Sequence, residues 1–132
     1  MQNWIKPGAE VALVYDRPQE CYAVRTATIT KVKKSWFEIS GTDDEFSTVT
    51  GRMKPPKGWR GVSAWRVIPL TDPEYPAYVR ADKIRAARNA AAHAVDFARA
   101  GYFVDRKAIE NAAEELARLA ELMASAEGGH RG

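Results

Sequence analysis

Cysteine is almost missing from this chain. Cys21 is the single cysteine in 132 residues, so no internal disulfide can form. This excludes the disulfide-stapled secreted scaffolds and fits a reducing compartment. No window approaches the roughly 18 apolar residues that a membrane span needs, and the start, Met1–Pro7, has no basic segment followed by an apolar run. We therefore expect a soluble, cytoplasmic protein that does not enter a membrane.

Groups that carry enzyme chemistry are also scarce. Histidine occurs only as His93 and His130, and neither has a cysteine, serine or carboxylate at the spacing of a triad or a metal site. The segment 58–61 lacks the spacing of a phosphate-binding loop. The acidic residues 43–45 are interpreted as a solvated turn, because a calcium site needs six or more oxygens. We predict a protein that is not an enzyme, with no catalytic residue, metal or cofactor.

The composition changes once along the chain, near Thr71. Val, Thr, Ile, Trp, Pro and Gly are frequent before it, whereas Ala, Glu, Arg and Leu are frequent after it. This is a change from strand-forming to helix-forming residues. The first half has eleven Lys and Arg against seven Asp and Glu, and the second half has nine against ten. The basic surplus of the chain, +3 in all, therefore belongs to the predicted β region.

Alternating apolar residues predict five short strands in the first half. The expected strands are 10–15, 24–33, 36–39, 46–50 and 64–70. A bent, long second strand among five short ones favours a small, strongly twisted barrel, because closure removes exposed edges. The predicted fold class is α+β, with a five-stranded SH3-like β-barrel at residues 1–71.

The second strand should contain a bulge. Its inward positions are Ala27 and Ile29 and then Val32, a shift from odd to even numbering. One inserted residue near 30–31 would produce this shift. The following strand should direct Phe37 and Ile39 inward and Trp36 and Glu38 outward.

The second half predicts an antiparallel helical hairpin at residues 72–127, followed by a disordered tail at 128–132. Thr71 and Glu74 are expected to cap the first helix, with Pro76 separating a brief turn from its main part, Ala77–Ala100. Gly101 should end it, and Asp105 should cap the second helix, with Val104 and Ile109 forming a hydrophobic staple. The expected apolar stripes are Ile84, Ala87, Ala91, Ala94 or Val95 and Ala98 in the first helix, and Ile109, Ala112, Leu116, Leu119 and Met123 in the second.

Cations and aromatic residues alternate in two segments of the first half. The candidate binding residues are Lys31, Lys33, Lys34 and Trp36 in one segment, and Arg52, Lys54, Lys57, Trp59 and Arg60 in the other. Such residues can contact phosphates while a tryptophan stacks on a base. Exposed tryptophan and arginine are also typical of protein interfaces. Alternatively, Trp59 covers an open barrel end and the lysines maintain solubility.

One stretch resembles a known group of proteins. Thr26–Ile39 (TATITKVKKSWFEI), followed by Phe46 and Gly51, is similar to small SH3-like or KOW-like β-barrel proteins common in bacteriophage genomes. The resemblance extends over residues 8–70, and Lys33 stands where the family has glycine. It implies a phage-encoded accessory factor in the cytoplasm of a bacterial host.

Two functional hypotheses follow. The first is a non-enzymatic binding protein that binds and modulates a host protein. The alternative is a nucleic-acid-binding protein that uses residues 51–61 and 31–36. Self-association through the helical hairpin is a further expectation for its partners.

Overall fold

The computed structural model describes residues 2–100 and 106–129. They form an α+β protein in which a five-stranded antiparallel sheet precedes two helices. The chain divides into two compact units, Met1–Val79 and Arg80–Gly132. Each unit is described separately below.

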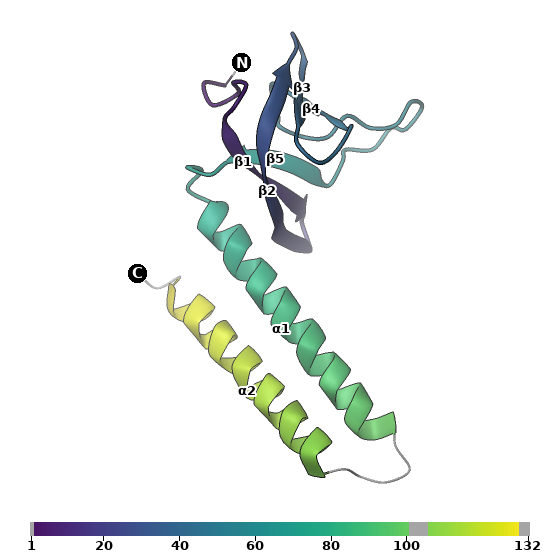
Figure 1. The fold of residues 1–132 in the computed structure, drawn as a ribbon, viewed down its shortest axis with the longest axis vertical. Helices are drawn as coiled ribbons and strands as arrows, with labels where there is room; N and C mark the ends of the chain where they lie inside the picture. The colour runs from purple at the N-terminus through teal and green to yellow at the C-terminus, as the bar shows by residue number, and fades with distance from the viewer. Residues whose placement is uncertain (1, 101–105, 130–132) are drawn as a thin grey trace. The chain divides into compact units, whose positions relative to one another are not determined.

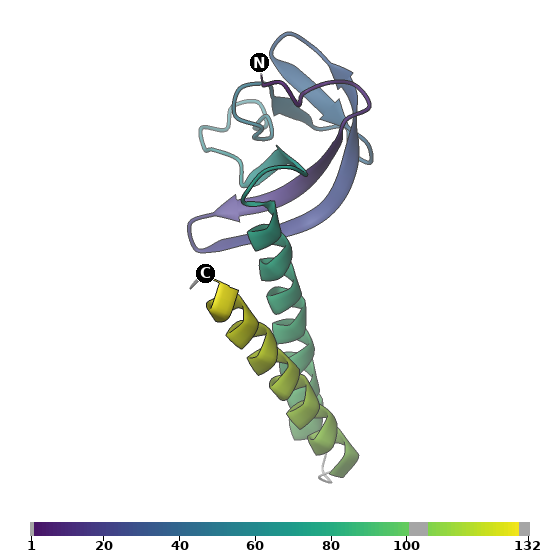
Figure 2. The ribbon, with the colours of Figure 1, turned by 90° about the vertical axis from the view of Figure 1, so that its left-hand side faces the viewer.

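The first unit is a curled sheet that forms an open half-barrel (Figures 1 and 2). Its strands are β1 (Glu10–Arg17), β2 (Glu20–Val32), β3 (Trp36–Ile39), β4 (Glu45–Ser47) and β5 (Trp65–Pro69). Their order across the sheet is β4-β3-β2-β1-β5, and every neighbouring pair is antiparallel. All five predicted strands are therefore present.

The long strand β2 joins the two halves of the sheet, pairing with β1 first and with β3 later. Its register against β3 shifts between Ile29 and Lys31. This confirms the predicted bulge and the change of inward positions, because Ala27 and Ile29 are buried before it. A second bulge, where β1 meets β2 at Leu13 and Val14, was not predicted.

Large apolar side chains fill the inner face of the curled sheet. The buried members of this core are Ile5, Val11, Ala27, Ile29, Phe37, Ile39, Phe46 and Val67. Trp4 packs edge-on against Phe37, with ring centroids 5.8 Å apart. Phe37 and Ile39 point inward, as predicted from the alternation along β3.

The outer face of β1 and β5 has a smaller core. Ala12, Val14 and Ile68 pack there with Tyr78, which belongs to the first turns of helix α1 (Tyr75–Ala100). The start of this helix differs from the prediction. The Asp72 carboxylate, not Thr71, accepts the hydrogen bond of the Glu74 amide at 2.8 Å. Pro76 lies inside the first turn, where its missing N–H costs nothing.

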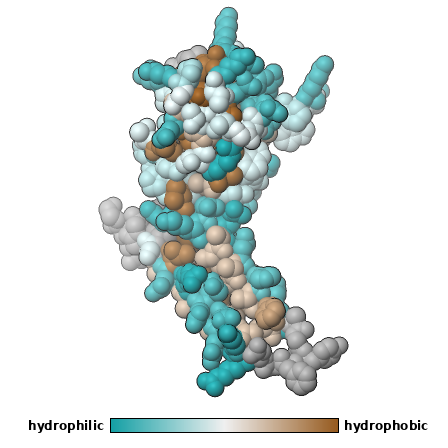
Figure 3. All heavy atoms as spheres, in the orientation of Figure 1, coloured by the Kyte–Doolittle hydropathy of each residue, from teal (hydrophilic) through white to brown (hydrophobic). Residues whose placement is uncertain are grey.

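The second unit contains the rest of α1 and helix α2 (Arg106–Gly129). In Figures 1 and 2 these helices lie side by side and run in opposite directions. Alanines are its buried side chains: Ala87, Ala91, Ala108 and Ala112. The small side chains allow helix axes to approach closely. Pale brown atoms along the helices mark this alanine-rich composition in Figure 3.

The predicted apolar stripe is right for α1 and largely wrong for α2. In α1, Ala87 and Ala91 are buried as expected. In α2, Ile109, Leu116 and Met123 are exposed, and the stripe that includes Ala108 and Ala112 is the buried one. The predicted roles of Gly101, Val104 and Asp105 lie outside the described residues.

Candidate binding site

The two predicted cationic segments meet at Glu45 on β4. The Lys33 ammonium lies 2.9 Å from the Glu45 carboxylate, and Lys54 lies 3.8 Å from its other oxygen. The Lys54 ammonium also sits 5.0 Å from the Trp36 ring centroid, a cation–π contact. We call Lys33, Trp36, Glu45 and Lys54 the Glu45 cluster.

Backbone pairing builds the Glu45 cluster. β3 and β4 pair with Trp36 opposite Ser47, and the Lys33 amide donates to the Trp36 carbonyl at 2.7 Å. The Lys54 amide donates to the Glu45 carbonyl at 2.7 Å. These bonds bring residues 31–36 and the start of the 51–61 segment to one edge of the sheet, which the sequence did not predict.

The carboxylate neutralises part of the charge in this cluster. The hydrogen bond from Lys33 lowers the pKa of Glu45, and the positive charges of Lys33, Lys54 and Lys31 lower it further. The same hydrogen bond raises the pKa of Lys33. Lys33 and Glu45 are therefore both ionised at neutral pH. Two of the predicted binding cations, Lys33 and Lys54, pair with the Glu45 carboxylate.

Arg52 is engaged inside the sheet unit. Its guanidinium lies 3.0 Å from the Asp16 carboxylate and donates to the Ser63 carbonyl at 3.0 Å. Arg66 reaches the same Asp16 oxygen at 3.4 Å. Arg52 thus connects β1 to the segment before β5, a structural arrangement that the sequence interpretation did not include.

The other predicted residues are exposed. They are Lys31 and Lys34 near the β2–β3 turn, and Lys57, Trp59 and Arg60 in the loop before β5. The Trp59 side chain is 52% exposed and lies over Gly61, since a Cβ there would come within 3.1 Å of its ring. No described contact joins Trp59 to the Glu45 cluster.

The open end of the half-barrel contains a cavity of about 390 Å³. We call it the open-end cavity. Its apolar lining consists of Leu13, Val24, Phe46, Met53 and Trp65, and its polar lining consists of Arg25, Gly41, Thr42 and Asp44. A concave apolar surface with a few polar groups at its rim is typical of a ligand pocket.

Aromatic rings continue from the open-end cavity along the sheet. Tyr15 packs edge-on against Trp65, with centroids 5.2 Å apart, and stacks on Tyr22 at 5.1 Å. The sequence did not predict this group, because Tyr22 lies between the expected strands 10–15 and 24–33. A hairpin turning at Pro18 and Gln19 would have set Tyr15 opposite Tyr22, as the register shows.

Residues 23–27 of β2 form an unpaired strand edge. Within the described residues they pair with β1 alone, because β3 joins β2 only from Ile29 onward. The Thr28 N–H and C=O point away from β1 and form hydrogen bonds with Ser40. Along a strand, successive residues direct these backbone groups to opposite sides. Thr26 therefore also presents its N–H and C=O outward, and the Arg25 guanidinium approaches that carbonyl at 3.5 Å.

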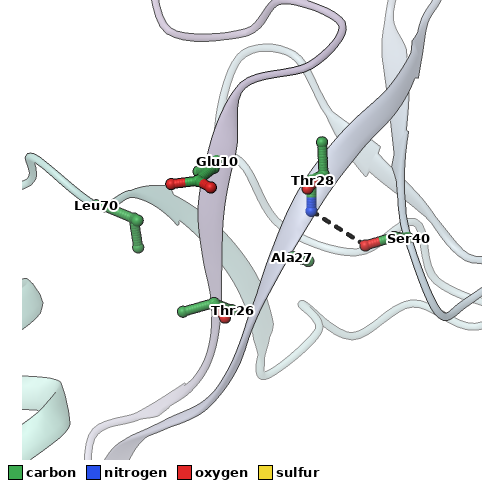
Figure 4. A pocket seen from close by; sticks show the side chains of 6 residues that line it. All are labelled: Glu10, Thr26, Ala27, Thr28, Ser40 and Leu70. Carbon is green, nitrogen blue, oxygen red and sulfur yellow. Dashed lines mark hydrogen bonds between the residues drawn. The ribbon is translucent and has the colours of Figure 1, made fainter.

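A second pocket of about 290 Å³ lies along the same strand (Figure 4). Its lining residues are Glu10, Thr26, Ala27, Thr28, Ser40 and Leu70. The Ser40 hydroxyl accepts the Thr28 amide at 3.1 Å, the dashed line in Figure 4. Val24 and Arg25 line the first cavity and Thr26 and Thr28 line this one, so both hollows adjoin the unpaired edge of β2.

Cys21 lies on β2 and is exposed, although it falls between the expected strands 10–15 and 24–33. Its thiol lies 3.3 Å from the Asp16 carboxylate and 3.0 Å from the Arg17 carbonyl. Burial and the Asp16 hydrogen bond raise its pKa, which disfavours the reactive thiolate.

Among the described residues, no group of three or more His, Cys, Asp or Glu could hold a metal ion. Neither of the two described helices is long and apolar enough to cross a membrane. Comparisons with protein-family models, curated proteins and solved structures give no match.

Proposed function

We propose that the protein is a non-enzymatic protein-binding module that takes an extended segment of its partner at the edge of β2. The open-end cavity beside an unpaired strand edge carries this proposal. An added strand gains main-chain hydrogen bonds from the edge and places alternate side chains to either face. One pocket lies beside Val24 and Arg25 and the other beside Thr26 and Thr28, so an added strand would pass both.

The chemistry of the two pockets indicates the kind of segment that fits. Leu13, Met53 and Trp65 offer an apolar surface for an aliphatic or aromatic side chain. Thr26, Thr28 and Ser40 offer hydroxyls for a small polar one. The stacked Tyr15 and Tyr22 extend the contact surface at low entropic cost, as aromatic anchors do at interfaces.

We also propose that the half-barrel is of the SH3-like kind. The strand order β4-β3-β2-β1-β5 and the long bent β2 support this. So do the isolated bridges from Phe46 to Met53 and from Arg52 to Arg66, through which residues 52–53 link β4 to β5. With the resemblance of residues 8–70 to phage proteins, this makes a protein of a bacterial host the proposed partner.

Selection from a display library of random peptides tests the proposal. Enriched peptides should bind the intact chain and slow amide hydrogen exchange at Ala23 and Thr26 on the β2 edge. Val24→Asp should abolish binding, because it places a charge in the apolar lining, whereas Val49→Asp, at a 73% exposed position outside both pockets, should leave it unchanged. An equal affinity in Val24→Asp would contradict the proposed site.

Nucleic-acid binding is a second candidate, and the contact of Lys54 with Trp36 favours it. Lys54 contacts the half-buried Trp36 ring, and Lys33 and Lys31 add positive charge nearby at Glu45. Phosphate contacts make affinity fall steeply with salt. A mobility-shift titration at two salt concentrations should show this fall in affinity. A triple variant with Lys54, Lys57 and Arg60 changed to alanine should bind more weakly than the wild type. No shift at low salt would eliminate this candidate.

A further inference from the structure

Helix α2 has a second apolar seam beside the one that is buried. Ile109, Leu116 and Met123 are spaced seven residues apart and are 48%, 49% and 44% exposed. Ala113 and Ala120 lie between them and are also exposed. The five positions follow steps of four and three residues, which is the pattern of a coiled-coil seam. We call these five residues the outer seam of α2.

The outer seam is distinct from the seam that is covered within the helical unit. The covered positions precede it by one residue each: Ala108, Ala112, Glu115, Leu119 and Leu122. Successive residues lie about 100° apart around a helix, so the two seams occupy neighbouring sectors. A helix packed against one neighbour needs an apolar stripe of about 100°, whereas α2 has about twice that. The extra width is typical of a helix with a second helical neighbour.

The charges of the two helices indicate which neighbour fits. Helix α1 carries five Lys and Arg against two Asp, and α2 carries five Glu against three Lys and Arg. A second copy of this chain supplies a basic helix for each acidic one.

We infer that the protein forms a dimer in which two helical hairpins assemble into a four-helix bundle through the outer seam. The dimer has two-fold symmetry, and the outer seam of each acidic α2 faces the basic α1 of the other copy. Two helices about 36 Å long and about 10 Å wide offer roughly 700 Å² per copy, close to the area of a stable interface.

Sedimentation equilibrium of the full chain from about 10 to 300 μM tests this dimer, a range chosen for micromolar association. The wild-type mass should approach twice 14.7 kDa. Leu116→Asp should weaken association at least about 100-fold, because it places a charge in the apolar interface. Asn111→Asp is the matched control, since it adds the same charge outside both seams, and its association should be unchanged.

Two further measurements distinguish a loss of association from misfolding, and specific helix pairing from non-specific apolar contact. Leu116→Asp should keep the helical circular dichroism of the wild type, which shows that the loss is one of association. Raising the salt concentration should weaken the wild-type dimer, because screening reduces the attraction between the basic and acidic helices, whereas a purely apolar contact would not weaken. A monomeric wild type at the highest concentration overturns the inference, as does a Leu116→Asp variant that remains dimeric.

Discussion

The two units of this protein are stabilised by very different cores. Among the described residues, the largest fully buried side chains all belong to the sheet unit: Phe37, Phe46, Ile29, Ile39, Ile68, Val11, Val14 and Val67. The buried residues described in the helical unit are alanines, while Phe97, Ile109, Leu116 and Met123 are exposed. Since apolar burial contributes about 25 cal/mol per Å², the sheet has most of the stabilising free energy. The helical unit has apolar surface left for association.

Two spectroscopic probes separate the units. All four tryptophans, Trp4, Trp36, Trp59 and Trp65, lie in the sheet unit. Tryptophan fluorescence therefore reports unfolding of the sheet, whereas circular dichroism at 222 nm reports mainly the helices. Each variant below is expected to change one signal more than the other.

The largest effect is expected for Ile29→Asp. Ile29 is 1% exposed in the inner core of the sheet, and an aspartate there would be an unpaired charge among apolar groups. We expect a loss of more than about 4 kcal/mol in the free energy of unfolding, measured by tryptophan fluorescence in urea. A near-native midpoint would show that the inner face of β2 is assigned wrongly.

A smaller loss is expected for Gly51→Ala. Gly51 has a φ of 76°, and a Cβ there would collide with the Val67 carbonyl oxygen. The Val67 amide donates to the Gly51 carbonyl at 2.8 Å, which holds the two backbones together. The sheet should lose about 2 to 4 kcal/mol. Gly58→Ala is the control, because its φ of 86° is similar but nothing lies within 4 Å of its Cβ position. Its cost should be about 1 kcal/mol, and equal losses would contradict the steric argument.

Ala91→Leu probes the thin core of the helical unit. Ala91 is 2% exposed on the covered face of α1, so a leucine would force the helices apart. We expect a loss of about 1 to 3 kcal/mol in the transition followed at 222 nm, with the fluorescence transition unchanged. Ala92→Leu changes the adjacent exposed residue and should stay within about 0.5 kcal/mol of the wild type. Equal effects of the two variants would mean that the alanine seam is not packed.

The sheet was more predictable from the sequence than the helices were. Alternation along β3 and the change of parity between Ile29 and Val32 identify inward residues directly, because strand side chains have a strict period of two. Along α2, apolar residues occupy two neighbouring seams, so residue spacing alone does not determine which seam is buried. The predicted stripe combined residues of both seams: Ala112 is buried as expected, whereas Ile109, Leu116 and Met123 are exposed and the buried Ala108 was not predicted.

The candidate site was only partly predictable for a related reason. Local composition identified the lysines and Trp36, but not the acid that pairs with them, because Glu45 comes from another strand. The open-end cavity depends on residues from β1, β2, β4 and β5 together. Its position follows from register and curvature, and neither the bulge at Leu13 nor the Tyr15–Tyr22 pair is evident from residue types alone.

The smallest effect is expected at the solvent-accessible ion pair of Lys33 and Glu45. The folded-state pKa of Glu45 is lowered, so its ion pair stabilises the sheet above the unfolded pKa and loses that contribution as the pH falls through the folded value. Glu45→Gln should therefore lower stability slightly at pH 7 and have no effect in strongly acidic solution, well below about pH 4. Urea titrations by fluorescence at several pH values measure this difference. Asp43→Asn changes a neighbouring exposed carboxylate that takes no part in the Lys33–Glu45 or Lys54–Glu45 ion pairs, and this control should show no such pH-dependent difference. If the two variants respond alike to pH, the coupling of Glu45 to the lysines contributes nothing to the sheet, and those lysines are free for a ligand.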